Sequence, residues 1–171
     1  MLRLATFSLI ILSLVSPTAA PQKDNLASQF AGAWRLISIE GTSPVTPRVY
    51  DRPTGMIMYD PSGRMAVQIA SQAHRKPFAK GIRSGTPEEK AAAFDTYIAY
   101  YGTYTVDAKA GTVTHHLEDR LAPGGRGVNN VRYFEFRGDR VVLMPVEDGK
   151  GGVIARKDAT YKLTWERINI D

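Results

Sequence analysis

The sequence predicts an all-β fold, an eight-stranded antiparallel up-and-down β-barrel with one short inserted helix near residues 87–99. Three observations predict it. Short runs rich in β-branched and aromatic residues recur along the chain, separated by Gly, Pro, Asn and Asp. Most neighbouring runs lie only a few residues apart, which favours a meander of hairpins, and a meander leaves costly edges unless it closes. The 171 residues, 43% of them hydrophobic, suffice for one packed domain.

Eight strands are expected, at residues 33–39, 54–59, 65–70, 101–106, 112–118, 131–136, 140–144 and 159–167. The second and third are joined by residues 60–63 (Asp-Pro-Ser-Gly), in which Pro and Gly suit a tight turn. Residues 107–111 and 137–139 join two further hairpins. Eight strands is the size at which a barrel interior can hold one small ligand.

One segment departs from the β pattern. Residues 86–89 (Thr-Pro-Glu-Glu) place a cap hydroxyl before Pro at the first helical position and Glu at the third, which predicts a capping box. Strong helix formers follow at 90–93, and the spacing of one helical face links Phe94, Tyr97, Ile98 and Tyr101. We therefore expect a helix from Pro87 to about Ala99.

The first twenty residues have the pattern of a secretory signal peptide: one Arg, an apolar run over 4–15 and small residues up to Ala20. We expect cleavage near residues 18–22, then a polar lead-in over 21–29 with one helical turn, then the barrel domain over 30–168. The run is shorter than the about 20 residues of a membrane span, so no stable membrane insertion is expected after cleavage. The alternatives are a buried N-terminal helix and a retained anchor. The expected location is secreted or periplasmic.

Composition excludes several classes of function. The chain has no Cys, which excludes disulfides, thiolate metal sites and a cysteine nucleophile. The net charge of +5 comes from scattered basic residues with no basic block, so no nucleic-acid partner is expected. No phosphate-binding loop, dinucleotide fingerprint or Gly-x-Ser-x-Gly elbow is present, and no cofactor is predicted. The sequence leaves the oligomeric state open.

Three stretches resemble the bacterial and fungal lipocalin-like domain proteins. Residues 32–36 (GAWRL) resemble the Gly-x-Trp of the first lipocalin strand, and residues 163–167 (LTWER) resemble the terminal strand. Residues 97–107 (YIAYYGTYTVD) with 111–116 (GTVTHH) are similar to the longest motif of that group. The resemblance implies a calycin-like barrel around a largely apolar cavity, and it implies no settled activity. Unlike animal lipocalins, the chain lacks disulfide cysteines and has its helix in mid-chain.

The same resemblance implies a structural role for two residues. In lipocalins the tryptophan that matches Trp34 closes the barrel floor, with an arginine of the last strand stacked on it. Arg167 is the matching arginine here, and a cation–π contact is the interaction implied.

His115 and His116 are adjacent on a predicted strand, so their side chains point to opposite faces. If Val113 faces inward, His115 enters the cavity and His116 faces solvent. Such a pair cannot chelate one metal ion in regular strand geometry, and no metal site is predicted. Three roles stay open for His115: a buried histidine bonded to a neighbour, a polar anchor for a ligand, and a general acid or base as the candidate catalytic residue.

The predicted ligand-binding residues are Tyr59, Tyr101, Tyr104, His115 and Arg132. Tyrosine combines a large apolar body with one hydroxyl, which suits a pocket wall, although the tyrosines expected on the helix are more often part of an ordinary core. Arg132 shares one side of its strand with Phe134. If that side faces the cavity, Arg132 needs a carboxylate partner or an anionic ligand, whereas a bulge or the opposite register places it in solvent.

The leading hypothesis is a secreted or periplasmic lipocalin-like protein that binds one small hydrophobic molecule in the barrel. The alternative is an enzyme, a cyclase or isomerase that acts on a lipid-like or polyketide-like intermediate in the same cavity. A third hypothesis is a barrel filled by its own side chains that serves as a scaffold or interaction protein, which predicts no cavity.

Overall fold

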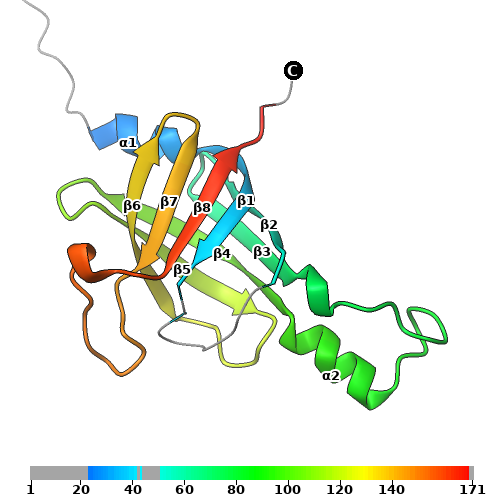
Figure 1. Cartoon of the computed structure of the whole chain (residues 1–171). Helices are drawn as coiled ribbons and strands as arrows, with labels where there is room; N and C mark the ends of the chain where they lie inside the picture. The colour runs from blue at the N-terminus through cyan, green and yellow to red at the C-terminus, as the bar shows by residue number, and fades with distance from the viewer. Residues whose placement is uncertain (1–22, 42, 44–50, 170–171) are drawn as a thin grey trace, which may run out of the picture.

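The computed structural model confirms the predicted fold: eight strands form a closed barrel in which neighbours follow sequence order. It describes residues 23–41, 43 and 51–169. Every neighbouring pair is antiparallel, and the last strand pairs with the first, so the barrel has no open edge (Figure 1). The strands are β1 (Gly32–Glu40), β2 (Pro53–Tyr59), β3 (Arg64–Ser71), β4 (Tyr97–Asp107), β5 (Thr112–Arg120), β6 (Asn129–Arg137), β7 (Arg140–Pro145) and β8 (Lys162–Arg167).

The helices are α1 (Lys23–Phe30) and α2 (Pro87–Asp95), with short 3-10 helices at Gln72–His74 and Arg156–Asp158. The predicted signal peptide (1–20) lies outside the described residues. Helix α1 occupies most of the segment predicted as a polar lead-in, and it has about two turns rather than one. Its last residue, Phe30, is fully buried in the barrel, which gives this polar segment an apolar anchor.

Helix α2 begins where the sequence predicts and ends earlier. The Thr86 hydroxyl accepts from the Glu89 N–H at 3.2 Å, and the Glu89 carboxylate accepts from the Thr86 N–H at 2.8 Å, so the capping box is confirmed. The prediction of helix up to Ala99 was wrong, because β4 begins at Tyr97. Tyr97 pairs with Ala70 of β3, and the next residues gain strand hydrogen bonds and a place in the barrel wall. These tertiary contacts outweigh helix propensity.

One end of the barrel is filled, and we call it the closed end; helix α1 lies across it (Figure 1). The ring of Phe30 lies 5.0–5.1 Å from the rings of Tyr59, Phe134 and Phe136. The Trp34 indole N–H donates to the Phe30 carbonyl at 2.8 Å. Aromatic packing and hydrogen bonding therefore attach α1 to the barrel.

Arg167 completes the closed end. Its guanidinium carbon lies 4.1 Å from the centre of the Trp34 ring, in a cation–π contact. The same guanidinium donates to the Ala31 carbonyl at 2.7 Å and to the Gln29 carbonyl. Arg167 thus joins the last strand to the first strand and to α1.

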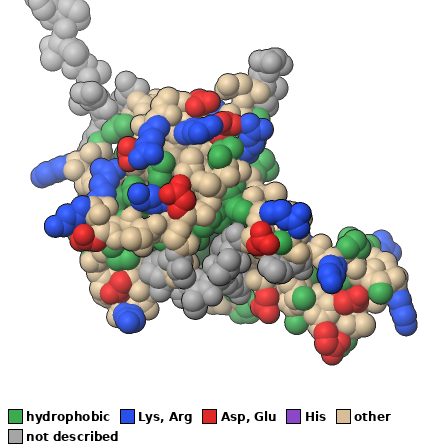
Figure 2. All heavy atoms as spheres, in the orientation of Figure 1, with side chains coloured by type: hydrophobic (Ala, Val, Ile, Leu, Met, Phe, Trp, Pro, Cys, Tyr) green, Lys and Arg blue, Asp and Glu red, His purple; other side chains and the backbone are tan. Residues whose placement is uncertain are grey.

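The outer surface carries mixed charge. Figure 2 shows basic and acidic side chains interspersed over the visible face rather than gathered in one patch. Glu166 accepts from both Arg35 and Arg140, on the neighbouring strands β1 and β7. No helix within the described ranges has the length and apolar character needed to cross a membrane.

Candidate functional site

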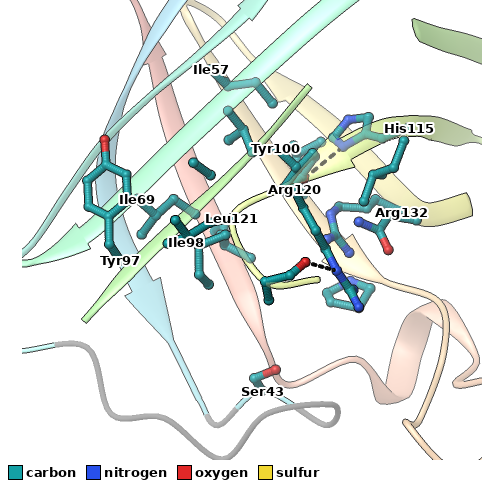
Figure 3. A pocket seen from close by; sticks show the side chains of 18 of the residues that line it. Ser43, Ile57, Ile69, Tyr97, Ile98, Tyr100, His115, Arg120, Leu121 and Arg132 are labelled. Atoms are coloured by element: carbon teal, nitrogen blue, oxygen red, sulfur yellow. Dashed lines mark hydrogen bonds between the residues drawn. The ribbon is translucent and has the colours of Figure 1, made fainter. Parts of the chain in front are cut away.

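The other end of the barrel, which we call the open end, contains a cavity of about 270 Å³ (Figure 3). Most of its wall is apolar, with aliphatic side chains from β2, β3, β4, β7 and β8: Ile57, Val67, Ile69, Ile98, Leu143 and Leu163. Phe94 and Leu121, which are 40% and 42% exposed, line its outer part. The hypothesis of a barrel filled by its own side chains predicts no cavity, and this cavity argues against it.

His115 stands in the wall of this cavity with no exposed surface. Along β5 the buried positions alternate, with Val113, His115 and Leu117 facing inward, as the two-residue period of a strand requires. His115 Nε2 lies 2.8 Å from the Tyr59 hydroxyl, and Nδ1 lies 3.0 Å from the Tyr100 hydroxyl. Both ring nitrogens are therefore hydrogen-bonded.

His115 is held neutral. Burial lowers the pKa of the imidazole well below its ordinary value, and the charges of Arg132 and then His116 lower it further. A neutral imidazole has one donor and one acceptor nitrogen. One of the two tyrosines must therefore donate to His115, and the other must accept from it.

Tyr59 is the donor in this arrangement. Its side chain is 2% exposed, and burial, the largest effect, raises the pKa of its hydroxyl well above the ordinary value, so it keeps its proton. The partner that the structure gives this hydroxyl is His115. Because a buried hydroxyl proton must be bonded, Tyr59 donates to Nε2, and Nδ1–H donates to Tyr100. The proton of the Tyr100 hydroxyl is then available to a molecule in the cavity, which Tyr100 lines.

Arg132 also lines the cavity and is half-buried. On β6 it lies two residues beyond Asn130, the strand partner of His115, so it is a diagonal neighbour of His115 on the inner face. The ion pairs found among the described residues do not include Arg132. The carboxylate in the cavity wall is that of Glu147, which is exposed.

A β-bulge brings a second arginine to the cavity. The register between β4 and β5 shifts at Gly102, so that Arg120 pairs with Tyr100 and shares its inner face. The Arg120 guanidinium donates to the carbonyls of Ala122 and Pro123 at 3.1 and 3.4 Å. A side chain at Gly102 would place Cβ 1.9 Å from the His116 carbonyl oxygen, so the bulge requires glycine there.

The five predicted ligand-binding residues occupy four different kinds of position. His115 and Arg132 line the cavity, and Tyr59 lies behind His115 as its hydrogen-bond donor. Tyr104 does not line the cavity: its hydroxyl donates to the Asp60 carbonyl at 3.2 Å, and its ring lies 4.8 Å from that of Tyr59. Tyr101 is 48% exposed and points outward, because alternate residues of β4 face opposite sides and its neighbour Tyr100 faces inward.

The predicted ligand-binding residues did not include three polar or aromatic residues of the wall that matter for the site: Tyr100, Arg120 and Trp165. The two-residue alternation along residues 97–107 was a usable signal for Tyr100, because it places Tyr100 and Tyr104 on one face. Arg120 had no such signal, since its orientation depends on the bulge. Trp165 belongs to the terminal motif, which indicates a strand and not the direction of its side chain.

His116 lies on the other face of β5, where its ring nitrogens lie 2.9 Å from the Thr105 hydroxyl and 2.8 Å from the Asn129 side-chain oxygen. The described part of the chain contains no cluster of three His, Cys, Asp or Glu residues with the geometry of a metal site.

Comparison with known proteins adds two findings. A family model described as a lipocalin-like domain matches residues 31–168 of the chain. The chain is also 29% identical over 110 residues to the 4'-hydroxy-3'-methoxypropiophenone carrier protein ppsC of Aspergillus oryzae, an alignment that covers 61% of this chain and 96% of that protein.

Proposed function

Because the chain belongs to the lipocalin-like domain family, we propose that it binds one small, largely apolar molecule in the cavity at the open end of its barrel. The observation that carries the proposal is the cavity itself, about 270 Å³ with an apolar wall and a few polar groups around His115. Ligand sites combine these features, and pockets for drug-sized ligands have volumes of about 300–1,000 Å³, so the expected ligand is small. Burial of its apolar surface supplies the affinity, at about 25 cal/mol per Å² before the costs of ordering.

The similarity to a carrier protein supports transport or sequestration of the ligand. The name of that relative specifies an aromatic ketone with hydroxyl and methoxy groups, a compact molecule with a flat ring. A ligand of this size and shape suits the apolar wall of the present cavity. We propose a small hydrophobic ligand of this general kind for this chain.

The proposed location is outside the cytoplasm. The support is the pattern of residues 1–20, a single Arg followed by an apolar run and small residues. Expression of the full chain in its host, fractionation and N-terminal sequencing test this proposal. We expect a secreted or periplasmic protein that begins between residues 18 and 22 of the printed sequence. A cytoplasmic protein that retains Arg3 would contradict it.

Binding is tested with the neutral fluorophore N-phenyl-1-naphthylamine, whose emission rises in apolar surroundings. We expect saturable binding by the wild-type protein and at least about tenfold weaker binding by Ile98→Trp, which fills the cavity from β4. Tyr101→Trp is the matched control, since it adds an indole to the outer face of the same strand. Circular dichroism checks that both variants fold. Absence of saturable binding to the wild type, or equal binding by both variants, would contradict the proposed site.

The Tyr59–His115–Tyr100 chain favours a second candidate function, a proton-transferring isomerase or cyclase. A neutral histidine between two tyrosine hydroxyls can relay a proton to or from a bound carbonyl compound. The test is exchange of the α-hydrogens of propiophenone in D₂O, followed by NMR. An enzyme of this kind accelerates exchange, and Tyr100→Phe abolishes the acceleration while fluorophore binding persists. Exchange at the rate of buffer alone identifies a binding protein without this activity.

A further inference from the structure

We propose that the ligand of this cavity is an organic acid, bound as its anion, with the charged oxygens at Arg132 and the Tyr100 hydroxyl and the apolar body against the aliphatic wall. The inference rests on the proposed function, because it names the chemical class of the molecule in the same cavity. Three separate features of the open end support it.

The first feature is a cation in the wall that has no ion-pair partner among the described residues. Arg132 is half-buried beside His115, and none of the ion pairs of the described residues includes it. His115 cannot serve as a counter-ion, because an imidazole is either neutral or positively charged. A half-buried charge of this kind is costly unless an opposite charge compensates it, and a bound anion supplies that charge.

The second feature is the direction of the hydrogen bonds around His115. Tyr59 donates to His115 and His115 donates to Tyr100, so the proton of the Tyr100 hydroxyl is left for the cavity. Tyr100 and Arg132 occupy the inner face of β4 and β6, on either side of His115 on β5. Figure 3 shows His115 and Arg132 on the same side of the cavity, across from Ile69 and Tyr97. This side of the wall thus presents a cation and a hydroxyl donor to the ligand.

The third feature is an unpaired donor in the same wall. Trp165 lines the cavity and is 1% exposed, and its indole N–H has no hydrogen-bond partner among the described residues. Buried polar atoms without a partner are rare in folded proteins and call for an acceptor. An acidic ligand brings oxygen acceptors into this wall.

The remaining charges near the cavity fit the same ligand. Arg120 adds a second positive charge at the wall, although loop carbonyls occupy its guanidinium. Glu147 supplies the negative charge in the wall, and it is exposed to solvent. The rest of the wall is largely aliphatic, with Val67, Ile69 and Leu163 among its side chains. The expected ligand therefore has one acidic group and an apolar body, as an aryl-alkanoic acid does.

The test compares two molecules of the same shape that differ in charge. 4-Phenylbutyrate and 4-phenylbutyramide each displace bound N-phenyl-1-naphthylamine at pH 7.4. We expect the acid to bind the wild-type protein at least about tenfold more tightly than the amide, the advantage expected for one hydrogen bond to a charged group. Arg132→Gln removes this advantage and changes the affinity for the amide less than about twofold.

Three further variants make the assignment specific. Arg132→Lys keeps the charge and retains part of the preference for the acid. Tyr100→Phe weakens binding of the acid about threefold to tenfold, because it removes one donor. Arg137→Gln leaves the affinities for the acid and the amide unchanged, because it removes the same charge from an exposed position of the same strand.

The outcomes separate the two proposals. If the fluorophore does not bind to the wild type, the proposed function fails. If the fluorophore binds but the acid and the amide compete equally, or if Arg132→Gln weakens both to the same extent, only the assignment of an acidic ligand is overturned.

Discussion

The two ends of the barrel contain the same kinds of side chain, but polar groups that have hydrogen-bond partners at one end lack them among the described residues at the other. Trp34 at the closed end and Trp165 in the cavity wall are both 1% exposed. The indole N–H of Trp34 donates to the Phe30 carbonyl, whereas that of Trp165 has no partner among the described residues. The indole N–H at the closed end is hydrogen-bonded within the protein, whereas the one at the open end has no partner among the described residues.

Two arginines, one at each end, differ in the same way. Arg167 lies over the Trp34 ring and donates to two backbone carbonyls. Arg132 faces the cavity, and the ion pairs of the described residues leave it out. The comparison teaches that the closed end supplies stability, while the open end keeps unsatisfied groups and empty volume for a ligand. Such sites commonly cost stability, which the rest of the fold must supply.

The largest expected effect is the loss of stability when an aromatic ring is removed from the closed end. Phe30→Ala at the closed end should lower the free energy of unfolding by about 3–5 kcal/mol, because it removes a fully buried ring that packs on three others. Phe94→Ala at the open end should cost less than about 0.5 kcal/mol, since that ring is 40% exposed. Urea unfolding of the two variants measures both values. Equal losses would remove the distinction between the ends.

The next effect concerns the hydroxyls of two buried tyrosines. Tyr59→Phe should cost about 1–3 kcal/mol, because it leaves the buried Nε2 of His115 without a hydrogen bond. Tyr104→Phe should cost about 0.5–1.5 kcal/mol, since it removes one neutral bond of 3.2 Å to the carbonyl of Asp60. Chemical denaturation compares the pair. A larger loss for Tyr104→Phe would contradict the role assigned to the Tyr59–His115 bond.

The third effect is a dependence of stability on pH. The pKa of His115 is lowered in the folded state by burial and by Arg132 and His116, while Tyr59 and Tyr100 face it as neutral groups. Below about pH 6.5 the unfolded chain therefore binds a proton that the folded chain excludes. Stability should be full above that pH and should fall on acidification, by at most about 1.4 kcal/mol per pH unit.

Urea unfolding at pH 7.5, 6.5 and 5.5 measures this loss. His115→Gln should flatten the dependence in that window, whereas carboxylates with lowered pKa values, such as Glu135 and Glu166, act at lower pH. An equally steep loss in His115→Gln would assign the effect to other groups.

The smallest expected effect is a change in Tm when an arginine is replaced, and this change has opposite signs at the two ends. Arg132→Met should raise the Tm of the ligand-free protein by about 2–4 °C, because it removes a half-buried cation that forms no ion pair with the described residues. Arg167→Met should lower the Tm, since it removes the cation–π contact and the bonds to α1. Differential scanning calorimetry gives both shifts. A decrease for Arg132→Met would indicate that Arg132 stabilises the empty barrel.

Much of the fold was predictable because it follows from local patterns. The tight turn at residues 60–63, the alternation of Val113, His115 and Leu117 and the capping box at Thr86 are all short-range signals. The end of α2 was not predictable from them. Residues 97–99 fit a helical stripe and a strand equally well, and pairing with β3, nearly thirty residues earlier, selects the strand.

The candidate site was predictable only in part. Two of its residues, His115 and Arg132, could be identified from the alternation of their neighbours on predicted strands. Tyr101 was assigned to the cavity in place of Tyr100, because a shift of one residue exchanges the two faces of a strand.

By itself, the sequence of this protein determined the number and order of its strands and the start of helix α2. It also predicted a closed barrel, in which no strand is left with an unpaired edge. These follow from periodicity and turn chemistry, which act over a few residues. Only the tertiary structure decided that one end is filled and the other hollow, and that Tyr100, Arg120, Arg132 and Trp165 line the same cavity as His115. The physical reason is that these features depend on contacts between strands that are distant in the chain. Strand register, bulges and the absence of a hydrogen-bond partner therefore cannot be predicted from a local sequence pattern.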